Sequence, residues 1–481
     1  MKLGRGQAPG PDLIGRETQE RLLARAEGAA ARARQTGEPT LAAVMQECDP
    51  NFDPSAVVLA ARRAGEPWGL TEQPDRGGYA LATLGEACEL KASGAERFGS
   101  VAEQWRNLAH GANSDQVDGP PGSGPIAFGG FAFDGRERAA GPWRGFGSAS
   151  MVVPTVSVTR RDGVAMATLQ VVVGPEDDPS VAVDAALRCA SRLDRSSSLP
   201  DGPGLAGTPP SVESGLPPEH YEAAVARALD AIDEGRVEKV VLAREVLVER
   251  GVDHDPGGIL SVLREVFPSC FLFAVGRGDA SLIGASPELL IRREGLHAST
   301  VALAGSAPRS ADPAVDAHIG ERLLRSPKDR SEQAIVTHRI SRTLEPSAVW
   351  VSGSEEPQLA RVANIQHLAT PIRARLREPV AAIELAGRLH PTPAVGGEPW
   401  SEASAVINEL EGLDRGWYAS PIGWSDAAEN GEFCVALRCA LLRGSEARCY
   451  AGVGVVAGSD PASELAETEL KLQALLPVVS L

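Results

Sequence analysis

The sequence predicts a mixed α/β fold, because helical and strand patterns alternate along the chain. Residues 18–35 are rich in Ala, Leu, Arg and Glu, which is typical of a helix, whereas β-branched residues alternate around turn signals in residues 150–174. The chain has 481 residues, of which 43% are hydrophobic, so it can bury two or three domain cores or one large double layer.

The N-terminal half is expected to be mainly structural. Residues 124–134 predict a further strand of an antiparallel sheet. Two segments rich in Gly, Pro, Ser and Asp, near residues 110–125 and 196–220, predict loops or linkers. They separate residues 1–210, in which acids, bases and cations do not gather at meaningful spacing, from a candidate functional region at 216–481.

The C-terminal half alternates helix and strand. Residues 217–248 begin with two prolines, followed by apolar residues at helical spacing, which predicts a helix. Gly235 is expected to end this helix in a turn, and the β-branched residues after it predict a strand. Further strands are expected at residues 270–276, 281–293, 431–444 and 447–456, and further helices at 326–344 and 460–476. This mixture again indicates an α/β protein.

The composition excludes several classes of partner. A formal charge of −17 repels nucleic acid and anionic membrane surfaces, so an anionic substrate would need a local basic pocket. The seven cysteines form no CxxC pair, which predicts reduced thiols and no zinc site. The N-terminus lacks the apolar core of a signal peptide, and no apolar run is long enough to cross a membrane. We therefore expect a cytoplasmic protein.

Two residues have the chemistry of a base and an acid. Lys239 shares one face of a predicted strand with Val241 and Ala243, where burial would favour a neutral amine that accepts a proton. The alternative is an edge-strand lysine that reaches solvent. Glu288 follows Ser-Pro in an apolar segment, where burial would favour a protonated carboxyl that donates a proton. Its alternative is a turn residue paired with an arginine such as Arg292.

Glu332 is a charged residue on a helix face that is predicted to be buried. Ser326 and Pro327 begin this helix, with Ser326 as the N-cap. Glu332 lies one turn before Val336 in the apolar stripe, so its carboxylate points toward the core. A buried charge needs a partner, and either an arginine or a metal ion would serve.

The last predicted helix gathers more charge on one face. Asp460 can cap it, and Glu464, Glu467 and Lys471 then follow on the same side. Two carboxylates one turn apart suit a hard cation that keeps several waters, which favours Mg²⁺. The alternative is a solvated face with an ion pair between Glu467 and Lys471.

Three further features are ambiguous. Residues 452–457 imitate a dinucleotide fingerprint, but Asp460 would repel a pyrophosphate and no second strand pattern follows, so these glycines are expected to admit a different ligand. Arg438, expected within a strand, could join Lys471 in a basic pocket for a dicarboxylate or could partner a buried glutamate. His367 is either a ligand-binding residue or a neutral core histidine.

Ten segments, taken in order, resemble the chorismate-utilising enzymes, and more closely the isochorismate synthases. They span residues 239–471 and are KVVLAR, GASPELL, LAGSAPR, SPKDRSE, IQHLAT, LHPTPAVGG, DRGWYASPIGW, FCVALR, YAGVGVV and SDPASELAETELK. AFGGFAFD in the N-terminal half resembles the family more weakly. Ten ordered motifs are far more specific than any one of them, so the functional interpretations outweigh their alternatives.

The resemblance implies an α/β (α+β) chorismate-binding fold, with two large, mainly antiparallel sheets packed face to face and helices outside. It implies Mg²⁺-dependent conversion of chorismate to isochorismate, which menaquinone biosynthesis, siderophore biosynthesis or another pathway would use. Lys239 matches the lysine that activates water for attack at C2, and Glu288 matches the acid that protonates the departing C4 hydroxyl. Glu332 and Glu467 match magnesium ligands, and Glu464 contributes through water.

The resemblance also implies substrate contacts. Arg438 and Lys471 match residues that hold substrate carboxylates. The further substrate-binding residues that it implies are Gly305, Ser306, His367, Ala394, Leu437 and Gly452. The chain departs from the family pattern at Ala307, Gln333 and Ser420, where arginine, histidine and glycine are common. These departures affect the positioning of substrate and remove no named acid, base or ligand.

Residues 389–399, LHPTPAVGGEP, hold a small methyl group in a stiff loop. Prolines and glycines lie on both sides of Ala394 and fix the position of the loop that carries its methyl group. In the family that the chain resembles, isochorismate synthases have alanine here, whereas aminating and salicylate-forming members tend to have threonine. We therefore expect Ala394 to help to choose the product.

Other activities compete with this prediction. A salicylate synthase would eliminate pyruvate in a second step, and anthranilate-type amination would need ammonia, although no glutaminase nucleophile motif is evident. From a different class, a non-catalytic chorismate-binding protein would not require the base and acid at Lys239 and Glu288. No obligatory protein partner is implied, and a monomer is expected.

Overall fold

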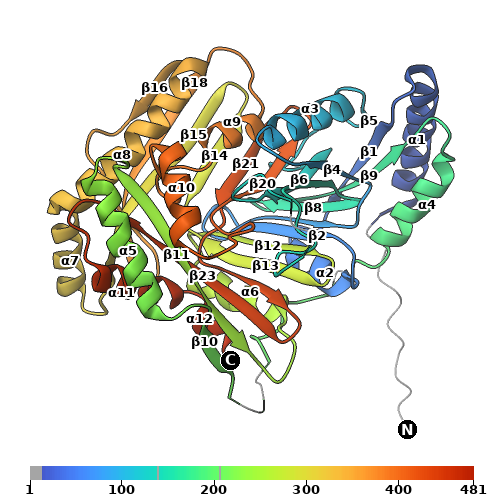
Figure 1. The fold of residues 1–481 in the computed structure, drawn as a ribbon. Coiled ribbons are helices and arrows are strands. Elements are labelled where there is room, and N and C mark those ends of the chain that lie inside the picture. Colours follow the sequence, from blue (N-terminus) through green and yellow to red (C-terminus); the bar gives the residue numbers. More distant parts are fainter. Residues whose placement is uncertain (1–13, 138–139, 195, 205–206, 208) are drawn as a thin grey trace, which may run out of the picture.

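Two large sheets form the body of the protein (Figure 1). The computed structural model describes residues 14–137, 140–194, 196–204, 207 and 209–481. The larger sheet has thirteen strands and the smaller has ten, and among the described strands the parallel pair is β1 with β5, the other pairs being antiparallel. The predicted class, an α/β fold with two large and mainly antiparallel sheets, is confirmed.

The larger sheet runs from β10 to β5. In spatial order its strands are β10 (Ser211–Ser214), β11 (Lys239–Glu249), β23 (Glu446–Val455), β22 (Cys439–Arg443), β13 (Ala280–Ser286), β12 (Phe271–Arg277), β2 (Trp68–Gln73), β3 (Tyr79–Leu84), β8 (Val156–Arg161), β9 (Val164–Val173), β1 (Thr40–Cys48) and β5 (Asn113–Ser114), with β19 (Gly397–Glu398) beside β11. Strands from the two halves of the chain meet where β2 pairs with β12.

The smaller sheet also joins the two halves, because β6 pairs with β20. In spatial order its strands are β16 (Ala348–Gly353), β18 (Ile365–Leu376), β15 (His297–Pro308), β14 (Leu289–Glu294), β21 (Gly431–Val435), β20 (Pro421–Asp426), β6 (Ile126–Phe131), β7 (Ala149–Val153) and β4 (Cys88–Ala92), with β17 (Gln358–Arg361) beside β18. Residues 1–210 and 216–481 therefore contribute to both sheets.

Helices cover the outer surfaces of the sheets. They are α1 (Arg16–Thr36), α2 (Pro54–Ala61), α3 (Arg97–His110), α4 (Pro179–Ala190), α5 (Pro218–Asp233), α6 (Pro256–Val266), α7 (Pro313–Arg325), α8 (Pro327–Leu344), α9 (Ala382–Leu389), α10 (Trp400–Leu410), α11 (Pro461–Leu472) and α12 (Leu476–Val479), with a 3-10 turn at Glu345–Ser347. Helices α1 and α4 lie beside β1 and β9 at one end of the molecule, and α8 packs on β15 and β18 at the other (Figure 1).

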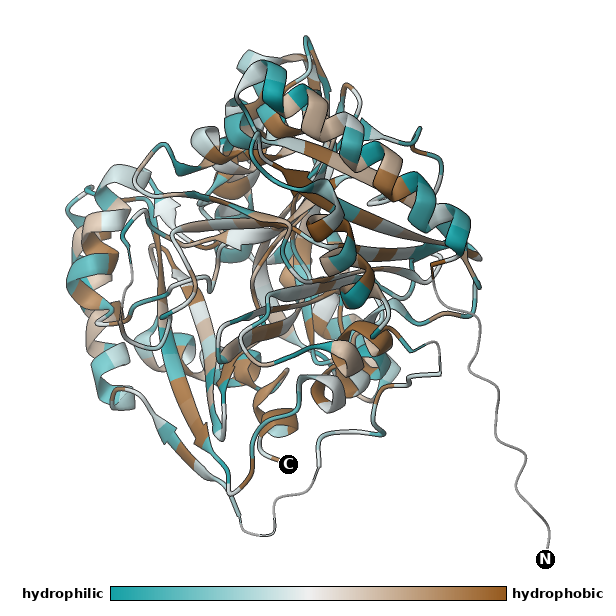
Figure 2. Cartoon of the chain, turned by 90° about the vertical axis from the view of Figure 1, so that its right-hand side faces the viewer, coloured by the Kyte–Doolittle hydropathy of each residue, from teal (hydrophilic) through white to brown (hydrophobic). Residues whose placement is uncertain are grey.

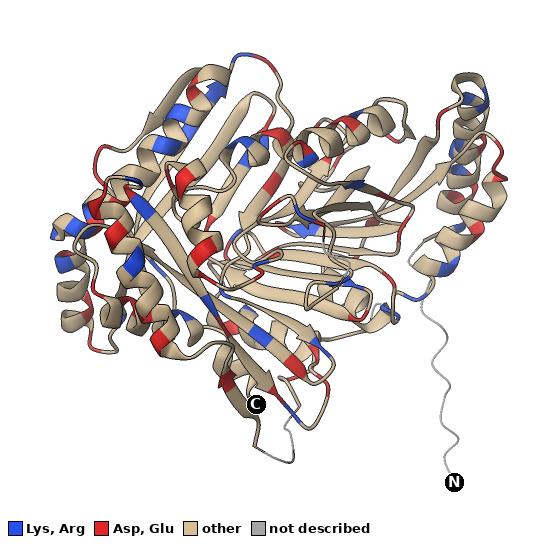
Figure 3. Ribbon diagram, viewed as in Figure 1, with Lys and Arg blue, Asp and Glu red and all other residues tan. Residues whose placement is uncertain are grey.

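The inner faces of the two sheets share one hydrophobic core. It contains Phe273 of the larger sheet together with Phe131 and Phe433 of the smaller one, and all three side chains are fully buried. Along the helices, apolar and polar residues alternate in the pattern of half-buried elements (Figure 2). Charged residues lie mostly on helices and loops, whereas β12 and β13 carry almost none (Figure 3). Burial of apolar area therefore holds the sheets together.

Local signals in the sequence place most element ends correctly. The Ser326 hydroxyl accepts a hydrogen bond from the Asp329 amide at 3.3 Å and caps α8, as expected. Asp460 caps α11 by accepting from the Ser463 amide at 2.9 Å. The segment at 196–220, predicted as a loop, instead contributes the short strand β10, which gains its hydrogen bonds from β11; residues 205, 206 and 208 lie outside the described part.

Among the described residues, no helix combines the length and the apolar character that crossing a membrane would need.

The paired glycines of AFGGFAFD lie where β6 touches its neighbours. A Cβ on Gly129 would stand 2.0 Å from the Ser150 carbonyl oxygen of β7, and one on Gly130 would stand 2.6 Å from the ring of Trp417. The backbone of a neighbouring strand cannot move away as a side chain could. Glycine at these positions therefore permits close approach of β6 to the structure around it.

We predict opposite effects of two Gly→Ala substitutions. Gly129→Ala should destabilise the protein by about 1–3 kcal/mol, because the added methyl overlaps the Ser150 carbonyl. Gly99→Ala in α3, where nothing lies within 4 Å of the new methyl, should stabilise by about 0.5–1 kcal/mol. The midpoints of urea unfolding measure both. Equal midpoints for the two variants would contradict the packing at β6.

Candidate active site

The sequence-predicted residues converge on one cavity of about 50 Å³ between elements of both sheets. Those that line it are Glu288, Gly305, Ser306, Glu332, His367, Ala394, Leu437, Arg438, Gly452, Glu467 and Lys471. Lys239 and Glu464 do not line the cavity and lie just behind it, each in contact with a charged partner. The structure thus brings together side chains that are more than 200 residues apart in the chain.

Lys239 is the first residue of β11 and its side chain is fully buried. Strand β11 has β23 on one side and both β10 and β19 on the other, so it is not an edge strand at Lys239. The alternative of a lysine that reaches solvent from a sheet edge is therefore wrong. The Lys239 ammonium lies 2.8 Å from Glu332 Oε1, and this lysine supplies the cation that the buried glutamate requires. A Cβ on Gly454 would stand 2.4 Å from the same carboxylate, so only glycine fits beside the pair.

Glu288 lies between β13 and β14 and is 2% exposed. Burial raises the pKa of its carboxyl to about 8, although Lys239, Arg438 and Lys471 act in the opposite direction. The carboxyl is therefore mainly protonated at neutral pH. Arg292, the expected alternative partner, instead contacts Glu432, so the structure leaves Glu288 as a buried proton donor at the cavity.

Arg438 lies outside regular strand structure, contrary to the prediction. It stands between β21 and β22 with a left-handed φ of 48°, and this break turns its side chain into the cavity. Its Nη2 lies 3.3 Å from Nε2 of His367, whose Nδ1 lies 3.2 Å from the Gly305 carbonyl and 3.0 Å from the Ser306 hydroxyl. Burial, Arg438 and Lys471 hold the pKa of His367 well below its usual range. A neutral His367 therefore accepts from Arg438 and orients it.

Each predicted metal ligand is paired with a different lysine. Besides the Lys239–Glu332 pair, Lys471 lies 2.7 Å from Glu467 and Lys328 lies 2.6 Å from Glu464. The alternative interpretation of the last helix, a Glu467–Lys471 pair, is thus present, but the pair lines the cavity and is not on a solvated face. Lys471 also donates to the Gly452 carbonyl at 2.9 Å.

The donor set fits a hard divalent cation. Within the described part of the chain, no three His, Cys, Asp or Glu side chains are already arranged around one point. Even so, Glu332 and Glu467 both line the cavity and offer carboxylate oxygens, the ligands that Mg²⁺ prefers. Burial lowers the pKa of Lys328, but its contact with Glu464 and the nearby charges of Glu332 and Glu467 outweigh that effect and raise it, so all three carboxylates act on one lysine.

The prediction missed two tyrosines of the cavity wall. The rings of Tyr418 and Tyr450 stack with centroids 5.2 Å apart, and both side chains line the cavity. The signal was in the sequence: Tyr450 precedes Gly452 and Gly454 with the period-two spacing that puts all three on one face of β23. Tyr418 lies in DRGWYASPIGW, one of the ten motifs that resemble the family.

The loop LHPTPAVGGEP forms a fixed wall of the cavity. The Thr392 carbonyl accepts hydrogen bonds from the amides of Val395 and Gly396, and Gly396 O accepts from the Val241 amide at 2.7 Å. Glu398 pairs with Lys239 in the β19–β11 ladder. Ala394 and Val395 face the cavity from this loop, so the wall is attached directly to the strand that carries Lys239.

A buried acid, a buried lysine, an oriented arginine and clustered carboxylates around one cavity define an enzyme that acts on a small anion. The chain belongs to the chorismate binding enzyme family, whose model matches residues 27–480. It is 39% identical to the salicylate biosynthesis isochorismate synthase of Pseudomonas aeruginosa, over 94% of this chain and 93% of that protein. It is 35% identical to the isochorismate synthase MenF of Bacillus subtilis, over 79% and 81% of the two chains.

Solved structures of related proteins have the same fold. The structure of DhbC from Bacillus anthracis superposes with a TM-score of 0.70 at 28% identity, covering 88% of this chain and 99% of that one. The menaquinone-specific isochorismate synthase MenF of Escherichia coli gives a TM-score of 0.76 at 24% identity, covering 95% and 99%. The chorismate-binding fold expected from the resemblance is confirmed.

We predict that Glu288→Gln changes the pH dependence of stability. In the unfolded chain the carboxyl loses its proton above about pH 4.5, whereas the folded protein keeps it until about pH 8. Wild type therefore loses stability relative to the variant as pH rises through this window, by roughly 1 kcal/mol per pH unit. Urea unfolding at pH 5 and pH 8 measures the difference. The exposed control Glu294→Gln should show none, and a flat difference for Glu288→Gln would mean that the carboxyl is ionised in the fold.

Proposed function

We propose that this protein is an isochorismate synthase, an isomerase that converts chorismate to isochorismate. The observation that carries the proposal is a buried Glu288, whose carboxyl has a raised pKa, in the wall of a cavity that also holds Arg438 and Lys471, with the buried Lys239 directly behind it. The similarity to isochorismate synthases over nearly the whole chain supports the same activity.

The proposed reaction uses one proton acceptor and one proton donor. The amine of Lys239 takes a proton from a water molecule as the water oxygen bonds to C2 of chorismate. The ring double bond shifts, the C4–O bond breaks, and Glu288 gives its proton to the departing hydroxyl, which leaves as water. Proton transfer through solvent from Lys239 to Glu288 restores both groups. The raised pKa of Glu288 suits this donor role near neutral pH.

Substrate binding is assigned to the cations of the cavity. Arg438 and Lys471 would hold the substrate carboxylates. Gly305, Ser306, His367, Leu437 and Gly452 would complete the substrate-binding wall, since all of them line the cavity.

Magnesium is the proposed cofactor. Glu332 and Glu467 would ligate it directly and Glu464 through water; when bound, the ion would neutralise a substrate carboxylate. In that state Glu332 would no longer pair with the Lys239 ammonium. Lys239 would act as a base after this ammonium has given its proton to solvent. Chelation should therefore abolish turnover.

The wider assignments are also proposals. Residues 1–210 would be the mainly structural part of the fold and residues 216–481 the catalytic region, which supplies the whole lining of the cavity. The protein would act in the cytoplasm as a monomer without an obligatory protein partner, on chorismate alone; its seven free cysteines support a reducing compartment. The isochorismate would serve menaquinone or siderophore synthesis.

The central experiment incubates purified protein with chorismate and Mg²⁺ and separates the products by chromatography. Wild type should form isochorismate, and Lys239→Ala should lower turnover at least about 100-fold while the protein stays folded by circular dichroism. Salicylate or an aminated product, or no conversion, would contradict the assignment. Retained turnover in Lys239→Ala would contradict the assignment of Lys239 as the base and would leave the proposed activity standing.

We predict that Ala394 helps to select the product. Ala394→Thr should lower kcat/KM for isochorismate roughly tenfold, because the new hydroxyl can hydrogen-bond the attacking water or the substrate, and should change the thermal midpoint little. Ala394→Val is the matched control, since valine has the shape of threonine without its hydroxyl. An equal loss in both variants would indicate a steric effect, and unchanged kinetics would mean that the methyl only packs.

A further inference from the structure

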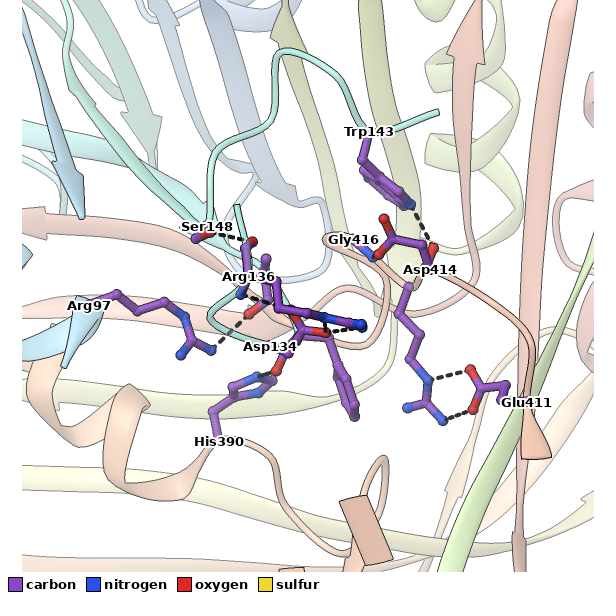
Figure 4. A network of polar contacts seen from close by, with 12 residues as sticks. Arg97, Asp134, Arg136, Trp143, Ser148, His390, Glu411, Asp414 and Gly416 are labelled. Carbon is purple, nitrogen blue, oxygen red and sulfur yellow. Dashed lines mark hydrogen bonds and ion pairs between the residues drawn. The ribbon is translucent and has the colours of Figure 1, made fainter. Parts of the chain in front are cut away.

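Arg415 is a buried arginine that lies directly behind the cavity wall. Its side chain is 3% exposed, and that of its ion-pair partner Glu411 is 1% exposed. The guanidinium donates to both oxygens of Glu411, from Nε at 2.7 Å and from Nη2 at 2.6 Å. Figure 4 shows these two parallel contacts at Glu411. Arg415 itself does not line the cavity that holds Glu288.

The same guanidinium binds two backbone carbonyls that belong to different walls of the candidate site. Nη1 donates to the Val395 carbonyl at 2.7 Å, and Nη2 donates to the Val241 carbonyl at 2.8 Å. Val395 follows Ala394 in the loop, and Val241 lies two residues after Lys239 on β11. One rigid, planar group therefore fixes the separation between the Ala394 wall and the strand of the proposed base.

The orientation of this guanidinium is determined from several sides. Glu411 accepts a hydrogen bond from the backbone of Ala243, so the carboxylate is itself anchored to β11. The ring of Phe133 covers the guanidinium, with its centroid 4.2 Å from the central carbon. Only a planar fork of donors can bind a carboxylate and two carbonyls at once, and a lysine ammonium cannot reproduce that geometry.

Stability alone is a weak reason for such a pair. Removing two charges from water costs much of what their attraction contributes, and apolar side chains of similar volume are commonly as stable. An apolar pair would lack the two donors to Val395 and Val241. The contacts that distinguish Arg415 from an apolar replacement are thus the ones that position the cavity walls.

We propose that Arg415 is a positioning residue that holds the Ala394 wall at a fixed distance from Lys239. The inference rests on the proposed isochorismate synthase activity. With the walls fixed, the attacking water is confined between the Ala394 methyl and the amine that takes its proton. Misplacement of about 1 Å far from the reacting atoms can cost on the order of 100-fold in rate.

The first test is Arg415→Lys, which keeps the charge and loses the fork. We expect kcat for isochorismate formation to fall about 10- to 100-fold. KM for chorismate should change less than about threefold, because Arg438 and Lys471, which are proposed to bind the substrate carboxylates, remain. A folded Arg415→Lys variant with wild-type kcat would overturn the proposal.

A second variant separates positioning from stability. Arg415→Met combined with Glu411→Leu removes both charges, so neither is left buried alone. Its thermal midpoint should stay near that of wild type while kcat stays low; recovery of kcat together with stability would refute a positioning role. Arg264→Lys is the control, because Arg264 also forms a two-point contact with a carboxylate, that of Glu72, and binds Asp53 as well, yet does not line the cavity. It should leave kcat within about twofold.

Amide hydrogen exchange tests the same contact without any activity. Arg415→Lys should speed exchange at the amides of Val395 and Gly396, which donate to Thr392 within the loop, and Arg264→Lys should not. Unchanged exchange in the folded Arg415→Lys variant would overturn the proposal. If wild type forms no isochorismate, the proposed function fails, while exchange still decides whether Arg415 holds the loop.

Discussion

The burial of Lys239 beside Glu332 is the constraint around which the site is built. A fully buried ammonium is costly unless a partner and a rigid surround compensate for the lost water. The surround here consists of β11 with strands on both sides, the N-terminal part of α8 and the short strand β19. Gly454 leaves the space that the pair occupies, since any side chain there would overlap the carboxylate. The order of the strands, the cap of α8 and the glycine at position 454 therefore together position one buried charge pair and leave space for it.

Much of this arrangement follows from local sequence signals. The N-cap at Ser326 sets the start of α8 and, through helical periodicity, the inward direction of Glu332. Strand alternation likewise puts Lys239 on the face of Val241. These predictions succeed because capping and periodicity depend on neighbours within a few residues. The roles given to the residues came from the resemblance of ten motifs, which local rules alone would not have supplied.

Other features depend on contacts between distant segments and were not predictable in the same way. Strand β10 forms in a Gly- and Pro-rich segment because β11 offers it an edge. Arg438 sits in a stretch of strand-forming residues, yet the chain breaks there into a left-handed conformation that aims its side chain at His367. No pattern in the sequence indicates that Lys328 pairs with Glu464, because α8 and α11 meet only in the folded protein.

The charge balance of the site connects its two states. Three lysines match the three glutamates of the proposed metal site one for one. Within the described part of the chain Arg438 forms no ion pair, and its neighbour His367 is neutral, so its positive charge is not cancelled by a contact. A protein of charge −17 thus keeps a local positive site for an anionic substrate. A divalent ion that takes over the glutamates would add to this field and would release the lysines at the same time. In the proposed function, the lysine pairs and the metal site would therefore be two arrangements of one set of carboxylates, and the pairs would keep that set buried until metal and substrate bind.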